Sequence, residues 1–193
     1  MNSPPNAQFS HTGFLVRDLD TMIAFYTRVL GLVVTDRGPY YKGGEIAFMS
    51  RSAGEHHQVV LASGRTDALH ASTINQLSFR VDSLEDLQTF HRRLLTEAVD
   101  EYAPRNHGNA WSIYFADPEG NRIELYAATP WHVQQPFGRP LDLSLSAAAI
   151  RQATHALLAD NPTLIGQAAW AQAFEARLKA SEPALPMAPE KGR

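Results

Sequence analysis

Four polar side chains of this sequence have the chemistry to hold a divalent metal ion: His11, His57, Gln76 and Glu124. Imidazole nitrogen and carboxylate oxygen are common ligands of Fe, Mn, Ni and Zn, and an amide oxygen can add a weaker third bond. Three protein ligands would leave coordination positions open for water, substrate or dioxygen. The chain has no cysteine, so a thiolate-bound metal, a disulfide framework and a thiol nucleophile are excluded.

Two of these residues occupy equivalent places in an internal repeat. Ser10–Val16 aligns with Asn75–Val81 at an offset of 65 residues, which places His11 on Gln76. The match continues downstream through a series of apolar residues at the same offset. The chain therefore contains two copies of one structural unit, each carrying a polar residue at the start of its first strand.

The same offset relates the other two candidates. Glu124 falls on the position of Val59, and alternate side chains of a strand share a face, so Val59 and His57 are expected to point the same way. By the same rule His56 is expected on the opposite face. Strand alternation therefore predicts that the four candidate side chains point into one groove, two from each repeat.

Each repeat begins with a strand that leads into an amphipathic helix. In the first copy, apolar residues recur at intervals of three and four from Met22 to Leu30, and Asp18 or Asp20 can cap the helix. In the second copy, Asp82 and Glu85 have the spacing of a capping box. The two copies therefore predict two similarly placed helices.

Short apolar runs separated by turn residues follow each helix. They predict three strands in each copy: Leu32–Asp36, Glu45–Ser50 and His57–Ala62 in the first, and about Val99–Ala103, Ala110–Ala116 and Asn121–Ala127 in the second. The fold class expected is α+β, with two tandem βαβββ modules that form curved sheets around a metal-binding cleft. This domain is expected to span residues 7–128, with modules at about 7–65 and 73–128.

The pattern changes from Thr129 onward, where prolines interrupt an extended segment. Helices are predicted at about Ser146–Leu158 and Ile165–Lys179, so residues 129–180 are expected to form a helical C-terminal extension. The extension is expected to pack on the outside of the sheets or on a partner subunit. Residues 181–193 are rich in proline and poor in large apolar side chains, which predicts a loosely ordered tail.

The composition is that of an ordinary globular protein. Hydrophobic residues make up 44% and charged residues 19% of the 193 residues, with a formal charge of −3. A chain without a basic surplus is not expected to bind nucleic acid. No stretch resembles a secretory signal or a membrane span, so a cytoplasmic protein without a membrane partner is expected.

Two segments carry a specific resemblance. The stretch His11–Leu19, followed by Phe25–Tyr26 and Val29–Gly31, resembles the opening of the vicinal oxygen chelate superfamily, and Tyr114–Leu125 resembles its final hairpin, whose Glu binds metal. The resemblance covers about Phe9–Ala127, and thus both modules. The superfamily includes glyoxalase I, fosfomycin-resistance enzymes, bleomycin-binding proteins and extradiol ring-cleaving dioxygenases, so it implies a fold more firmly than a reaction.

Further resemblances favour the extradiol dioxygenases, and the chain is similar to small single-domain 2,3-dihydroxybiphenyl 1,2-dioxygenases of the third type. His56–Leu61 is similar to the paired-His strand that supplies the acid–base His of these enzymes, matching His57. Tyr114 matches their active-site Tyr, and Asn106–Gly108 matches the loop that carries a substrate-contacting His, here His107. The resemblance implies an oxidoreductase that uses O2 to cleave a catechol-type substrate.

The same resemblance implies Fe(II) as the cofactor, with Mn(II) or another divalent metal as alternatives. The ligands carried over are His11, Gln76 and Glu124, although the extradiol enzymes have a second His where this chain has Gln76. Glyoxalase I can use Gln as a ligand at an equivalent strand. An arrangement in which His57 becomes a ligand instead of an acid–base group therefore stays open.

Two other functions remain as alternatives. Gln76 favours a redox-neutral, metal-dependent isomerase or lyase in the manner of glyoxalase I. A metal-free small-molecule binding protein, as in the bleomycin-resistance branch, would need neither His11 nor Glu124. Modules of this type often assemble face to face, so a homodimer is the expected assembly.

Overall fold

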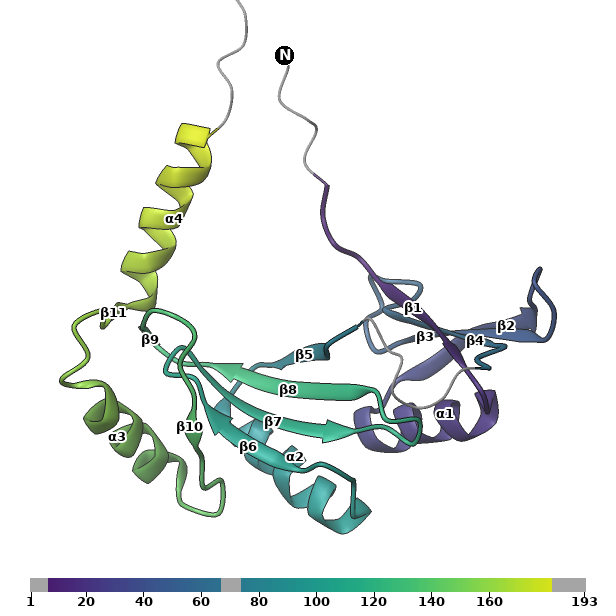
Figure 1. The fold of residues 1–193 in the computed structure, drawn as a ribbon, viewed down its shortest axis with the longest axis horizontal. Helices are drawn as coiled ribbons and strands as arrows, with labels where there is room; N and C mark the ends of the chain where they lie inside the picture. The colour runs from purple at the N-terminus through teal and green to yellow at the C-terminus, as the bar shows by residue number, and fades with distance from the viewer. Residues whose placement is uncertain (1–6, 67–73, 182–193) are drawn as a thin grey trace, which may run out of the picture.

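The computed structural model describes residues 7–66 and 74–181, and shows a mixed α+β molecule (Figure 1). The tail expected after residue 181 lies outside the described residues. Two sheet units lie next to each other, and the C-terminal helices α3 and α4 follow the second unit. The two predicted βαβββ modules are confirmed.

The first module forms a four-stranded sheet in the order β1-β4-β3-β2, with β1 parallel to β4 and the other neighbours antiparallel. Its elements are β1 (Thr12–Val16), α1 (Leu19–Phe25), the π-helical turn η1 (Tyr26–Leu30), β2 (Val33–Pro39), β3 (Glu45–Ser50) and β4 (Val59–Ser63). Asp18 caps α1 by accepting a hydrogen bond from the Thr21 amide, as its side-chain chemistry predicts.

The second module repeats this topology, with strand β10 of the extension added at one edge, in the order β10-β6-β7-β8-β5. Its elements are β5 (Leu77–Val81), α2 (Leu84–Glu97), β6 (Ala103–Asn106), β7 (Ala110–Ala116) and β8 (Arg122–Ala128). Strand β5 is parallel to β8, as β1 is to β4. The equivalence of the two modules thus extends to strand direction.

Two local predictions in the second module are wrong. The N-cap of α2 is Ser83, whose hydroxyl accepts from the Asp86 amide, so the cap lies one residue after the predicted Asp82. The strand predicted to begin at residue 99 begins at 103, because Ala98 and Glu101 have φ angles of 49° and 55°. Such left-handed conformations turn the chain and interrupt a strand.

The first helix ends in a π-helical turn that the apolar periodicity does not predict. The chain leaves this turn at Gly31, with φ 72°. A Cβ at this position would lie 1.8 Å from Nη1 of Arg51, whose guanidinium donates to the Leu30 carbonyl at 2.9 Å. Glycine therefore allows an arginine to cap the end of the helix.

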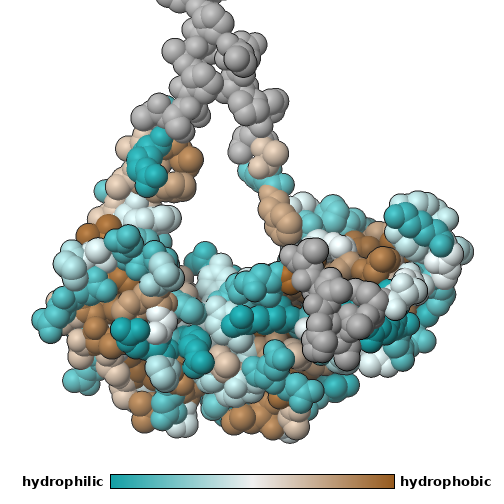
Figure 2. Space-filling model, viewed as in Figure 1, coloured by the Kyte–Doolittle hydropathy of each residue, from teal (hydrophilic) through white to brown (hydrophobic). Residues whose placement is uncertain are grey.

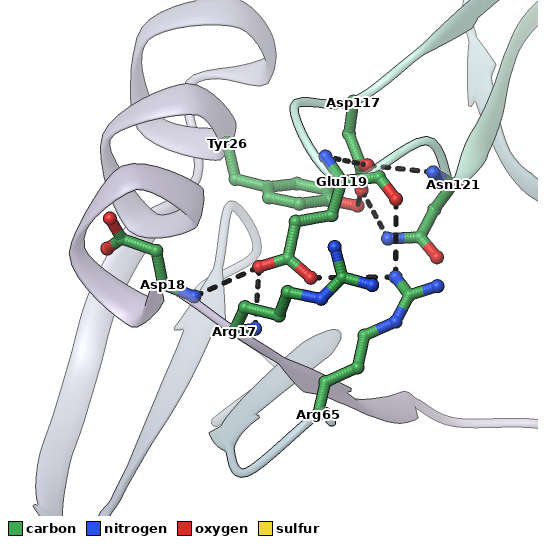
Figure 3. A network of polar contacts seen from close by, with 7 residues as sticks. All are labelled: Arg17, Asp18, Tyr26, Arg65, Asp117, Glu119 and Asn121. Carbon is green, nitrogen blue, oxygen red and sulfur yellow. Dashed lines mark hydrogen bonds and ion pairs between the residues drawn. The ribbon is translucent and has the colours of Figure 1, made fainter. Parts of the chain in front are cut away.

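The two modules share one hydrophobic core, in which Phe25 of α1 packs near Phe115 of β7. A buried polar network joins them at the β7–β8 turn (Figure 3). The Glu119 carboxylate accepts from the amides of Arg17 and Asp18 at 2.7 and 3.0 Å, at the start of α1. The positive end of a helix favours a carboxylate at this position. The turn of one module thus anchors the first helix of the other.

The C-terminal extension adds three short strands and two helices: β9 (Trp131–His132), β10 (Arg139–Pro140), α3 (Ala147–Leu158), β11 (Ile165–Gly166) and α4 (Gln167–Ser181). Helix α4 stands away from the rest of the molecule, and hydrophobic and hydrophilic residues mix along it (Figure 2). Trp170 at its base stacks on His132, with ring centroids 4.7 Å apart. None of the helices in the described ranges has the length and apolar content to span a membrane.

Candidate metal and substrate site

Glu124 is the centre of a polar cluster in the second module. Its side chain is nearly buried, with 8% of the residue exposed. Oε2 accepts hydrogen bonds from the Gln76 amide at 2.8 Å and the Ser78 hydroxyl at 2.6 Å, and Oε1 accepts from the Tyr114 hydroxyl at 2.7 Å. Hydrogen bonds of this kind stabilise a charged carboxylate. The cluster therefore holds the carboxyl group at a fixed position in the sheet.

The sheet register explains why these side chains meet. Strand β5 is parallel to β8 and pairs Ser78 with Glu124, while β7 is antiparallel to β8 and pairs Tyr114 with Glu124. Side chains of directly paired residues lie on the same face of a sheet. Gln76 lies two residues before Ser78 and donates to it at 2.9 Å. Three strands thus direct polar groups to one point.

Tyr114 is held in its protonated form. Burial raises the pKa of Tyr114 to about 12, and the hydrogen bond to Glu124 and its charge act in the same direction. The Arg122 guanidinium lies over the ring at 4.2 Å from its centroid and opposes the shift more weakly. The hydroxyl is therefore a hydrogen-bond donor at neutral pH.

His107 extends this chain of hydrogen bonds into a cavity. Its Nε2 lies 3.0 Å from the Tyr114 hydroxyl, and its Nδ1 lies 2.7 Å from the Phe137 carbonyl. A cavity of about 320 Å³ is lined by His107, Tyr114 and Glu124, with Asn109, Tyr126 and Gln135. A ligand in this cavity would meet a hydroxyl, an imidazole and a carboxylate.

A second cluster is made by histidines of the first module. His11 directly precedes β1 and His57 lies just before β4, and their rings are 4.2 Å apart between centroids. His57 Nδ1 lies 2.9 Å from Nδ1 of His56, whose Nε2 lies 2.8 Å from the Asp36 carboxylate. A β-bulge in β2 between Val34 and Asp36 changes which way that strand's side chains point. The bulge explains how Asp36 comes to reach His56.

The chain of contacts links both imidazoles to Asp36. A carboxylate accepts hydrogen bonds, so the contact with Asp36 favours hydrogen on Nε2 of His56. The 2.9 Å contact between the two Nδ1 atoms joins one donor and one acceptor. A neutral His57 has a lone pair on one ring nitrogen, as a general base or a metal ligand requires.

Burial lowers the pKa of His57, and the nearby rings of His11 and His56 lower it further. The charge of Glu55 opposes this shift to a smaller extent. The imidazole of His57 is therefore predominantly neutral at neutral pH.

The expectation that His56 points away from His57 is wrong. Strand β4 begins at Val59, so neither histidine belongs to the strand, and the alternation rule does not apply to them. Phe48 of β3 packs against His57, with 5.2 Å between ring centroids. The turn before β4 rather than the strand itself thus presents both imidazoles.

The structure brings the predicted site residues together in two groups. His11 contacts His57, whereas Gln76 and Glu124 contact each other and are joined to Tyr114 and His107. Within residues 7–66 and 74–181, no three His, Cys, Asp or Glu side chains are placed to hold one metal ion. The set His11, Gln76 and Glu124 has only two side chains of these four types, and it remains a prediction. Its nitrogen and oxygen donors suit a divalent cation in kind.

Three polar neighbours of these groups are not among the site residues predicted from the sequence. Ser78 shares a strand face with Gln76, a signal that the alternation pattern contains. Asp36 contacts His56 because a β-bulge in β2 redirects its side chain. Gln135 lines the cavity from the C-terminal extension, which is not part of the internal repeat. The last two have no sequence signal, since each depends on a contact between distant segments.

Residues 8–125 match the family model of the Glyoxalase/Bleomycin resistance protein/Dioxygenase superfamily. The chain belongs to this family, and the resemblance to the vicinal oxygen chelate superfamily is confirmed. The extension lies beyond the matched residues.

Individual relatives have different activities. The chain is 28% identical over 123 residues to a biphenyl-2,3-diol 1,2-dioxygenase of Rhodococcus globerulus, covering 61% of this chain and 61% of that protein. It is 25% identical to the fosfomycin resistance protein FosX of Listeria monocytogenes, in a structure with Mn(II) and a dihydroxypropylphosphonic acid. That match has a TM-score of 0.51 and covers 64% of this chain and 94% of the other.

A glyoxylase/bleomycin resistance protein/dioxygenase domain from Frankia is also 25% identical. Its TM-score is 0.56, and the match covers 64% of this chain and 93% of that one. The chain spans about three fifths of the Rhodococcus dioxygenase. The likeness therefore establishes the family and the fold, and it does not establish the reaction.

Proposed function

We propose that this protein is a metal-dependent extradiol dioxygenase that cleaves a catechol-type substrate, such as 2,3-dihydroxybiphenyl, with O2. The observation that carries the proposal is the hydrogen-bonded series Glu124–Tyr114–His107 along a cavity of about 320 Å³. A phenolic substrate needs donors and acceptors beside its hydroxyl groups, and this series supplies both. The similarity to a biphenyl-2,3-diol dioxygenase supports the choice of substrate.

His11, Gln76 and Glu124 would hold the metal, which we propose to be Fe(II), with Mn(II) as the alternative. When bound, such an ion would supply Lewis acidity toward the catechol oxygens and the redox capacity that O2 chemistry requires. The carboxylate of Glu124 supplies the negative charge of the set, and the sheet register holds it in place.

The remaining residues handle protons and orientation. The lowered pKa of His57 keeps its imidazole predominantly neutral at neutral pH, so it can take a proton from a substrate hydroxyl and return it later. Tyr114 keeps its hydrogen at neutral pH and donates it to Glu124, so its hydroxyl oxygen lies at a fixed position in the lining of the cavity. His107 lies within hydrogen-bond distance of Tyr114 and orients the same part of the substrate.

We further propose that the site is completed in a homodimer. The two groups of site residues lie beside β1 and β5, and each of these strands forms the edge of its sheet among the residues that the structure describes. A cavity of about 560 Å³ lies along β5 and is lined by Phe79–Val81 of that strand. If β1 of one copy lies beside β5 of another, His11 and His57 meet the Gln76–Glu124 cluster of the second copy.

The test is anaerobic purification and metal analysis, followed by addition of Fe(II) and 2,3-dihydroxybiphenyl in air. Oxygen uptake together with a yellow ring-fission product supports the dioxygenase. A bound metal without oxygen uptake contradicts it and supports a glyoxalase-like isomerase or lyase, which Gln76 favours as a ligand. Tight ligand binding without any metal contradicts both enzymes and supports a small-molecule binding protein.

A further inference from the structure

Residues 135–138 of the C-terminal extension, here named the strap, cross the loop that carries His107. The strap lies outside the residues that match the family model. It contributes Gln135 to the cavity and the Phe137 carbonyl to the imidazole of His107. The extension thus reaches into the candidate site.

Gln135 links the strap to the loop through its side-chain amide. Nε2 donates to the His107 carbonyl at 2.9 Å and to the Val133 carbonyl at 3.2 Å. Oε1 accepts from the Phe137 amide at 3.0 Å. One side chain therefore sets the position of the strap relative to the backbone of His107.

The Phe137 carbonyl decides the protonation of the ring. A carbonyl oxygen can only accept, so the 2.7 Å contact requires hydrogen on Nδ1 of His107. In the neutral ring Nε2 then has a lone pair, and this atom lies 3.0 Å from the Tyr114 hydroxyl. Tyr114 has one hydrogen and two acceptors, His107 and Glu124.

The extension also holds the loop from its other side. Thr154 of α3 is buried and accepts hydrogen bonds from Asn106 at 2.9 Å and from the Trp111 indole at 2.8 Å. Strand β10 pairs with β6 next to the loop, with Arg139 opposite Asn106. These buried contacts leave the loop little freedom, so the strap acts on a fixed target.

We propose that the strap is a positioning device, in which Gln135 and the Phe137 carbonyl hold His107 protonated at Nδ1. Nε2 then accepts a hydrogen bond from Tyr114 or from a hydroxyl group of the substrate. The role toward substrate rests on the proposed dioxygenase function, whereas the protonation of the ring does not. Positioning groups of this kind are effective because small displacements of a reacting group are costly.

The test measures the His107 ring directly in metal-free, ¹⁵N-labelled protein by two-bond ¹H–¹⁵N correlation at about pH 8, where an imidazole is neutral. The His107→Asn variant identifies the signals. The wild type should carry hydrogen on Nδ1. Gln135→Ala should shift a substantial fraction of the hydrogen to Nε2, and Gln135→Glu, which keeps the acceptor for the Phe137 amide, should shift less.

Gln134→Ala is the matched control, because within the described residues Gln134 forms a hydrogen bond through its backbone amide and none through its side chain. This variant should keep the hydrogen of the His107 ring on Nδ1, as in the wild type. In the turnover assay Gln135→Ala should lower kcat on the order of tenfold with little change in KM. Hydrogen on Nε2 of His107 in the wild type would overturn the proposal. So would a Gln135→Ala variant in which the hydrogen stays on Nδ1 to the same extent as in the wild type. Absence of turnover with the expected ring signals would refute the dioxygenase and leave the strap's role supported.

Discussion

At the scale of single residues, each side chain of the candidate site shares its hydrogen-bonding groups among several partners. Glu124 receives three hydrogen bonds, and Tyr114 has one hydrogen for two acceptors. Each partner therefore restricts the others. Gln76 is the least usual member, since an amide oxygen is a weaker ligand than an imidazole and cannot accept a proton at neutral pH.

Replacing Gln76 by His should strengthen metal binding. If residue 76 is a ligand, imidazole should raise the affinity for Fe(II) or Zn(II) by about tenfold or more, because it is the better donor. Anaerobic titration calorimetry measures this change, and Gln134→Ala serves as a surface control. An unchanged affinity in Gln76→His would mean that this position does not contact the metal.

At the scale of elements, the β7–β8 turn connects the modules through buried carboxylates. Asp117 is 4% exposed and accepts from the Tyr26 hydroxyl at 3.1 Å, next to Glu119, which pairs with Arg65 at 3.5 Å. Burial raises the pKa of Asp117 above its ordinary value of 3.8, although hydrogen bonds from Asn121, Glu119 and Tyr26 oppose the shift. Burial thus outweighs the hydrogen bonds at this carboxyl group.

The raised pKa predicts an unusual pH dependence of stability. Between pH 3.8 and the higher folded-state pKa, the native state binds more protons at Asp117 than the unfolded state, so its contribution to the free energy of unfolding falls as pH rises. The Asp117→Asn variant lacks this decrease, although losing hydrogen bonds should cost about 1 kcal/mol at every pH. The difference in the free energy of unfolding between wild type and Asp117→Asn should therefore become smaller as pH rises.

Urea denaturation of both proteins at a series of pH values from about 4 to 7 measures this difference. Tyr26→Phe is a useful control, because it removes one hydrogen bond to the same carboxyl group without removing its charge. Parallel pH profiles for wild type and Asp117→Asn would show that Asp117 has the same pKa in the folded and unfolded protein.

At the scale of the whole molecule, β1 and β5 each form an edge of their sheet in the part of the chain that the structure describes. The Thr12 amide donates to Gln58 and the Val16 carbonyl accepts from Gly64, so these residues direct their backbone groups toward β4. Backbone groups alternate along a strand in a parallel ladder, so the Leu15 amide faces the other, open edge. Leu15 is 46% exposed, so its side chain is accessible to the proposed β1–β5 contact between copies.

Proline at position 15 should therefore separate the copies without breaking the sheet of its own module. It removes an amide at the open edge and none from the β1–β4 ladder, and edge strands accept proline in such positions. We expect the wild type and Leu15→Ala to be dimers and Leu15→Pro to be a monomer with reduced metal affinity. Sedimentation equilibrium and metal analysis provide the readout, and a monomeric wild type that binds metal fully would contradict the shared site.

Much of the fold could be predicted because its signals are local. Helix and strand periodicities depend on neighbours a few residues apart, and the repeat doubles each signal, so the βαβββ order and most strand positions follow from sequence. Where a prediction failed, a non-local or conformational detail was responsible. The shift of β6 follows from left-handed residues at 98 and 101, and the orientation of His56 follows from a partner across a β-bulge.

The sequence by itself determined the two modules, the family and the polar residues that each module carries at its first and last strands. Only the tertiary structure decided how these residues are grouped. His11 lies beside His57 and His56 on the first module, and a hydrogen-bonded series runs from Glu124 to His107 on the second. It also placed the extension over His107. Such groupings depend on packing between distant segments, whereas local periodicity records only which face of its own element a side chain occupies.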